Sequence, residues 1–106
     1  MSKIDAWKAV REETLQNLDI RSKFEEFGVK FTGKVSSTNW AECYAFGRSD
    51  KNPSAAVNLT TGVYKDFAGD RLSIFDFMVQ HNLAPDWQEA QVVLAKSVGL
   101  AKKIPK

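Results

Sequence analysis

Apolar residues in the first quarter of the chain recur at helical spacing. This pattern predicts a helix that Ser2 can cap and that runs to about Asn17, with its stripe made of Trp7, Val10, Thr14, Leu15 and Leu18. Asp19 offers a second cap, and Gly28 the C-terminal end, for a short helix carrying Ile20, Phe24 and Phe27. The first 28 residues are therefore expected to form a helical arm.

From Val29 onward the period changes to two, which is typical of β-strands. The first strand alternates Val29, Phe31 and Gly33 with Lys30, Thr32 and Lys34, and so carries one basic face. After a turn at Ser36 and Ser37, the second strand has Trp40, Glu42, Tyr44 and Phe46 on one face and Ala41, Cys43 and Ala45 on the other. Strands at about 55–59 and 63–67 flank a three-residue hairpin loop, Thr60-Thr61-Gly62, with glycine at the left-handed position.

Two capping boxes predict two helices near the C-terminus. Ser73 with Asp76 opens a helix that is apolar around most of its circumference, and Asp86 with Glu89 opens another that Gly99 ends. The prediction is one α+β domain over residues 1–106: a helical arm (1–28), an antiparallel sheet of about four strands (29–71), two helices (72–99) and a basic tail (100–106).

The composition narrows the chemistry. Cys43 is the only cysteine and His81 the only histidine, so one chain can build neither a disulfide nor a cysteine-rich metal cage. We interpret Cys43 as a small buried hydrophobe and His81 as a residue that caps a carbonyl or faces solvent. No apolar run reaches the ~20 residues that span a bilayer, and the first ten residues lack a signal-peptide pattern, so we expect a cytoplasmic protein without membrane contact.

The formal net charge of +2 is too small to indicate nucleic-acid binding by itself, but its distribution is informative. Residues 1–26 carry five basic and six acidic side chains, whereas residues 27–75 carry six basic and four acidic ones. A phosphate-facing surface would therefore lie in the middle of the chain. The candidates are Lys30, Lys34, Arg48, Lys51, Lys65 and Arg71, for which the alternative is a solvated face.

An ordered set of short motifs runs from Ala45 to Phe77: Pro53-Ser54, a hairpin with Tyr64, a glycine-bearing turn at 68–70, and Asp76-Phe77 on a helix. In order and spacing this segment resembles the small N-terminal zinc-binding domain of bacterial and phage DNA primases. The flanking helices agree with that family in order.

The resembled family places its zinc ligands where this sequence has Ala45, Arg48, Asp66 and Gly69. All four ligands are therefore replaced, and the resemblance implies a domain without metal or other cofactor. Zinc can contribute on the order of 10 kcal/mol to so small a fold, so something must replace it. We expect apolar bulk to do so, through burial of Trp40, Phe46, Phe67, Phe75 and Phe77.

The resemblance also implies a function. The turns that carry the former ligand pairs would meet in space, so Arg48, Lys51, Lys65 and Arg71 are expected to form an anion-binding patch, with Tyr64 as the residue that stacks on an unpaired base. Such a module would hold single-stranded template DNA for a primase or polymerase of a phage, plasmid or other mobile element. It would not be an enzyme itself.

Two other functions stay open from the sequence alone. The first is an accessory module that docks on a replicative helicase or polymerase without touching DNA. The second is an enzyme that holds a divalent metal on Asp66, Asp70 and Asp76, although the capping box already accounts for Asp76.

Overall fold

Short polar side chains begin three of the helices at the predicted residues. In each case the side-chain oxygen of the cap accepts the amide N–H three residues later, at 2.8–3.1 Å. The three pairs are Asp19 with Ser22, Ser73 with Asp76, and Asp86 with Glu89. The two hydrogen bonds from Ser22 also hold the pKa of the exposed Asp19 carboxyl below its ordinary value.

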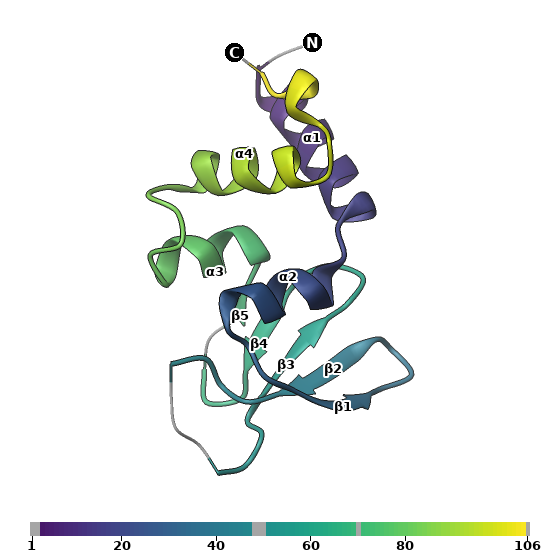
Figure 1. Ribbon diagram of the computed structural model, residues 1–106, viewed down its shortest axis with the longest axis vertical. Helices are drawn as coiled ribbons and strands as arrows, with labels where there is room; N and C mark the ends of the chain where they lie inside the picture. Colours follow the sequence, from purple (N-terminus) through teal and green to yellow (C-terminus); the bar gives the residue numbers. More distant parts are fainter. Residues whose placement is uncertain (1–2, 48–50, 70, 106) are drawn as a thin grey trace.

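The computed structural model describes residues 3–47, 51–69 and 71–105, and it confirms an α+β fold (Figure 1). The Ser2 cap lies outside these residues. The helices are α1 (Lys3–Asn17), α2 (Ile20–Phe27), α3 (Ile74–Gln80), α4 (Trp87–Ser97) and the 3-10 helix η1 (Ala101–Lys103). The strands are β1 (Phe31–Val35), β2 (Trp40–Cys43), β3 (Ala55–Asn58), β4 (Tyr64–Asp66) and β5 (Arg71–Leu72).

The strands form one antiparallel sheet in chain order, β1-β2-β3-β4-β5, with β3 at its centre. The two-residue β5 is a fifth strand where the sequence predicted about four. The β3–β4 hairpin turns as expected: Gly62 has a φ of +76°, and the Asn58 side chain accepts the amide N–H groups of Thr60 and Thr61 at 2.9 Å. Ile74 and Ile20 lie so close to Gly62 that a Cβ there would touch both, so the helices cover the hairpin tip.

The core lies between the sheet and helices α2 and α3. Its sheet side consists largely of small residues, Ala41, Cys43, Ala55 and Val57, all at most 1% exposed. Its helix side consists of large ones, because Phe24 and Phe77 fill the space that the small side chains leave, with ring centroids 5.1 Å apart. The face of β2 with small residues is therefore the buried one.

The molecule is elongated, with extents of 46 × 29 × 21 Å. Figure 1 shows the sheet at one end, α2 and α3 next to it, and α1 with α4 at the other end. One face of the sheet is thus left without a covering helix. Among the residues that the structure describes, no helix is long and apolar enough to cross a bilayer.

Candidate nucleic-acid interface

Strand register brings two basic residues together on the uncovered face of the sheet. Glu42 pairs with Ala56, Ala56 with Lys65, and Lys65 with Arg71, so these four residues form one row across β2 to β5. On β2 the row alternates with the buried Ala41 and Cys43, and on β4 Lys65 follows the buried Tyr64, so the row faces away from the helices, although Ala56 within it is only 6% exposed. Lys65 and Arg71, both exposed, are neighbours, as the sequence predicted.

Two aromatic residues accompany this row. Trp40 is half-buried, with the Arg71 guanidinium carbon 6.0 Å from its ring centroid, and Phe67 is 61% exposed. The expectation that both belong to the core is wrong, because the helices supply the large core rings and the small face of β2 turns toward them. The alternation that groups Trp40 with the polar Glu42 was the signal in the sequence for an outer position.

A hollow of about 340 Å³ opens between these aromatic residues. Ala56 stands in the outward row, and its small side chain leaves the space that a larger residue would fill. The hollow is thus bounded by rings, with a cation at its rim. It is lined by Lys34, Val35, Ser36, Trp40, Glu42, Ala56 and Phe67.

Tyr64 does not belong to this face, which corrects its expected role as a base-stacking residue. It is 3% exposed, and its ring lies 5.0 Å from that of Phe77. Its position opposite the buried Val57 turns it toward the core. A base cannot stack on the Tyr64 ring, because the core covers it.

The remaining predicted basic residues are placed unevenly. Lys34 lines the hollow, and Lys30 is exposed just before β1. Lys51 is exposed in the loop before β3, and Arg48 lies outside the described residues. Of the four-residue patch predicted from Arg48, Lys51, Lys65 and Arg71, the structure therefore brings together Lys65 and Arg71.

The positions of the resembled zinc ligands carry other interactions. Ala45 is 3% exposed, and the Asp66 carboxylate accepts the amide N–H of Ala68 at 2.8 Å. Gly69 is exposed in the turn after β4, and Arg48 falls in the undescribed gap. Across residues 3–47, 51–69 and 71–105, no group of three or more His, Cys, Asp and Glu side chains could hold a metal ion.

Cys43 is fully buried, as predicted. Burial, followed by the charges of Glu42 and Asp66, raises the pKa of the Cys43 thiol to about 12. Because only the thiolate is an effective metal ligand or nucleophile, this thiol is chemically inert near neutral pH.

Other contacts tie the segment after β2 to β4 and α3. The amide N–H of Phe46 donates to the Tyr64 hydroxyl at 3.0 Å, which joins the segment after β2 to β4. The Phe46 ring lies 5.1 Å from Phe77 and 4.6 Å from the half-buried His81. Of the aromatic residues expected to be buried, Phe75 and Phe77 are at most 1% exposed and Phe46 is half-buried, and His81 packs against Phe46 and Phe77 at the end of α3.

The fold is shared with a bacterial primase. The chain superposes on the crystal structure of the Aquifex aeolicus primase, which comprises zinc-binding and RNA polymerase domains, with a TM-score of 0.61 and 20% sequence identity. The match covers 89% of this chain and 21% of that one, so the chain spans about a fifth of the primase's length. No protein-family model matches the sequence, and no curated protein matches it either.

Proposed function

We propose that this chain is a metal-free, primase-related module that holds single-stranded template DNA for a separate primase or polymerase in phage, plasmid or other mobile-element replication. The observation that carries the proposal is the outer face of the sheet. There Lys65 and Arg71 stand beside a hollow bounded by Trp40 and Phe67. The primase fold supports the replication context.

Unpaired bases and phosphates make different demands, and this face meets both. An exposed ring such as Phe67 can stack on a base of any sequence, a contact worth ~1–3 kcal/mol. Cations neutralise phosphates and release counterions, so binding weakens as salt rises. If Lys34, Lys65 and Arg71 each meet one phosphate, affinity for a single strand should fall roughly twentyfold between about 50 and 200 mM salt.

The face also has features that select against duplex DNA. It is a sheet surface with a hollow, and within the described part of the chain no helix projects from it to enter a major groove. The rings are useful only where bases are unstacked. The polymerase reaction belongs to another domain or chain in this proposal, consistent with a chain that spans about a fifth of the primase sharing its fold.

The test is a fluorescence anisotropy titration of labelled oligothymidine at several salt concentrations. Phe67→Ala should weaken binding about tenfold, and Lys65→Ala with Arg71→Ala should weaken it and flatten its salt dependence. The matched control is Lys96→Ala with Lys102→Ala, which removes the same charge from exposed positions on α4 and η1. Repeating the parent titration in excess chelator should leave the affinity unchanged.

Three results would overturn the proposal. The first is a parent protein that does not bind the oligonucleotide at low salt. The second is a control variant that loses as much affinity as the variant of the sheet face, which would indicate unspecific charge attraction. The third is tighter binding to duplex than to single-stranded DNA of the same length.

A further inference from the structure

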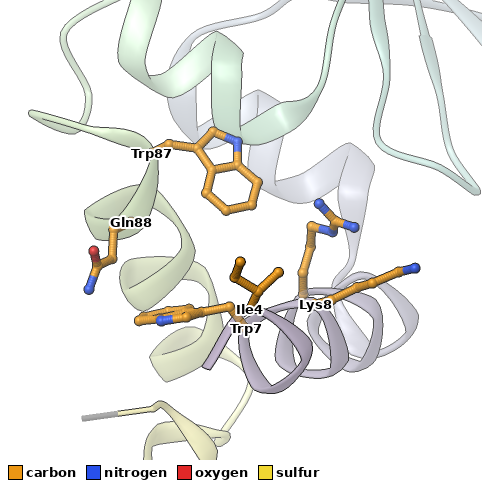
Figure 2. A pocket seen from close by; sticks show the side chains of 6 residues that line it. Ile4, Trp7, Lys8, Trp87 and Gln88 are labelled. Atoms are coloured by element: carbon orange, nitrogen blue, oxygen red, sulfur yellow. The ribbon is translucent and has the colours of Figure 1, made fainter. Parts of the chain in front are cut away.

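One side of helix α1 faces the start of α4 across a gap. Ile4, Trp7, Arg11 and Leu15 follow one another at three- and four-residue intervals and so share a side of the helix, while Val10 and Thr14 are the residues of α1 that are fully buried. A hollow of about 320 Å³ lies between this side and the start of α4, as Figure 2 shows. It is lined by Ile4, Trp7, Lys8, Arg11, Trp87 and Gln88.

A second hollow of about 280 Å³ extends the first. It shares Arg11 and Trp87 with the first and continues toward Leu15 and Thr61. The two together form one groove along α1, which we call the α1–α4 groove. From Ile4 to Leu15 the helix rises roughly 16 Å, the length of about three turns of a bound helix or five residues of an extended segment.

Contacts on the groove's walls hold it open in this shape. The Trp87 ring lies 5.5 Å from that of the buried Phe75, and the Arg11 guanidinium carbon lies 5.7 Å from the Trp87 centroid. The Gln91 side-chain amide donates to the Trp7 carbonyl at 2.8 Å and fixes α1 against α4. A preformed groove loses little conformational entropy on binding.

The groove exposes apolar side-chain surface that the fold leaves uncovered. Ile4 is 80% exposed and Trp87 is 37% exposed. Figure 2 shows the Ile4 side chain directed toward the Trp87 indole, with Trp7 beside them. A contiguous apolar surface with a polar rim is typical of a protein interaction site.

The charges on the rim indicate what kind of partner fits. Lys8 and Arg11 are the charged residues that line the first hollow, and within the described part of the chain neither forms an ion pair. The carboxylate of Asp76 lines only the second hollow. The first hollow is therefore complementary to carboxylates next to apolar groups.

We propose that the α1–α4 groove docks an amphipathic segment of a partner protein, in which Asp or Glu residues flank aromatic or branched apolar side chains. A second copy of this chain fits poorly, because a twofold contact would set Lys8 and Arg11 against themselves. DNA fits poorly too, because the aliphatic Ile4 offers no ring for stacking and Arg11 already lies over Trp87.

The probe is a fluorescent peptide of about a dozen residues, with Phe and Leu on one side of a helix and Asp and Glu elsewhere, compared with a twin in which Asn and Gln replace the acids. The acidic peptide should bind about tenfold more tightly than its twin. Trp87→Ala, and separately Lys8→Glu with Arg11→Glu, should each weaken it about tenfold. The second variant alters partly or fully exposed side chains only, so it tests the groove even if Trp87→Ala fails to fold.

The three tryptophans distinguish this surface from the sheet face in one experiment, because Trp7 and Trp87 line the groove and Trp40 lies on the sheet. In a proton–nitrogen NMR spectrum, the acidic peptide should shift the indole N–H signals of Trp7 and Trp87 and leave that of Trp40. Oligothymidine should do the reverse. Failure of oligothymidine to shift Trp40 overturns the proposed function alone.

Three outcomes would overturn the docking proposal. One is that the acidic peptide and its neutral twin bind equally. Another is that the acidic peptide does not bind or shifts Trp40 instead of the groove signals. The last is that oligothymidine shifts Trp7 and Trp87 as strongly as the peptide does, which would make the groove a nucleic-acid surface.

Discussion

The outer face of the sheet and the α1–α4 groove use the same kinds of residue in different geometries. Each has an arginine near a tryptophan ring, at 6.0 Å for Arg71 and Trp40 and at 5.7 Å for Arg11 and Trp87. On the sheet, period-two alternation sends the side chains outward from one flat layer. Between α1 and α4, the side chains face one another across a gap.

The comparison shows that residue type alone does not define the partner. A flat array of rings and cations suits a chain with a regular charge repeat and planar bases. A gap between two helices suits a segment with its own apolar ridge. The exposed apolar residue beside each arginine–tryptophan pair also differs. On the sheet it is the aromatic Phe67, and in the groove it is the branched aliphatic Ile4.

The largest effect we predict concerns the sheet end. Burial raises the pKa of Cys43 from 9.0 to about 12, so above pH 9 the unfolded chain releases a proton that the folded protein keeps. The Cys43 contribution to the free energy of unfolding is complete below about pH 9 and should fall by about 1.4 kcal/mol per pH unit above it, until about pH 12. Urea unfolding between about pH 8 and 11 measures this slope.

The control for this prediction is Cys43→Ala. This variant should lower the free energy of unfolding by about 1 kcal/mol at neutral pH, because it leaves a small cavity. It should also remove the contribution of Cys43 to the loss of stability above pH 9. Parallel pH profiles for the parent and this variant would contradict the prediction.

The next prediction separates the two ends of the molecule. Tyr64→Phe leaves the Phe46 amide without the Tyr64 oxygen and should lower the free energy of unfolding by about 1–3 kcal/mol. Binding at the α1–α4 groove should not change at temperatures where the variant is folded. Thermal unfolding and the acidic-peptide titration measure the two effects.

Tyr44→Phe is the matched control, because Tyr44 is a half-buried tyrosine just after β2 and no hydrogen bond from its hydroxyl occurs within the described residues. It should leave stability nearly unchanged. An equal loss in both variants would mean that the bond to Phe46 contributes nothing specific.

The smallest effect is expected at the helical end. The Thr14 hydroxyl oxygen is buried and has no hydrogen-bond partner among the described residues. Thr14→Val keeps the shape and removes this unsatisfied group, so stability should stay equal or rise by up to about 1 kcal/mol. Thr14→Ala should instead lower stability, because it leaves a cavity. Destabilisation by valine as large as that by alanine, measured by thermal unfolding, would show that the hydroxyl is satisfied.

Local signals in the sequence predicted most of the fold. Side chains such as Asp19 and Ser73 cap helices through bonds within three residues, and Gly62 satisfies a local backbone requirement, so each is readable without the rest of the chain. β5 was missed because two residues carry no alternation, and its pairing with β4 is a tertiary event.

The candidate site was harder to predict for a physical reason. Alternation assigns Trp40 and Cys43 to opposite faces but does not say which face the helices cover. That depends on Phe24 and Phe77, whose bulk matches the small side chains of β2 and β3. Lys65 and Arg71 were correctly predicted as neighbours. Tyr64 was expected on the surface and Phe67 in the core, whereas Tyr64 is buried and Phe67 is exposed.

The 46 Å long axis has a consequence for how the two proposed partners would influence each other. A protein segment held in the groove and a strand held on the sheet would lie within one molecular length, which corresponds to an effective concentration on the order of millimolar. Two partners that attract each other too weakly to associate in free solution would then associate while both are bound to this domain. The domain would hold the two partners near each other without changing its own shape.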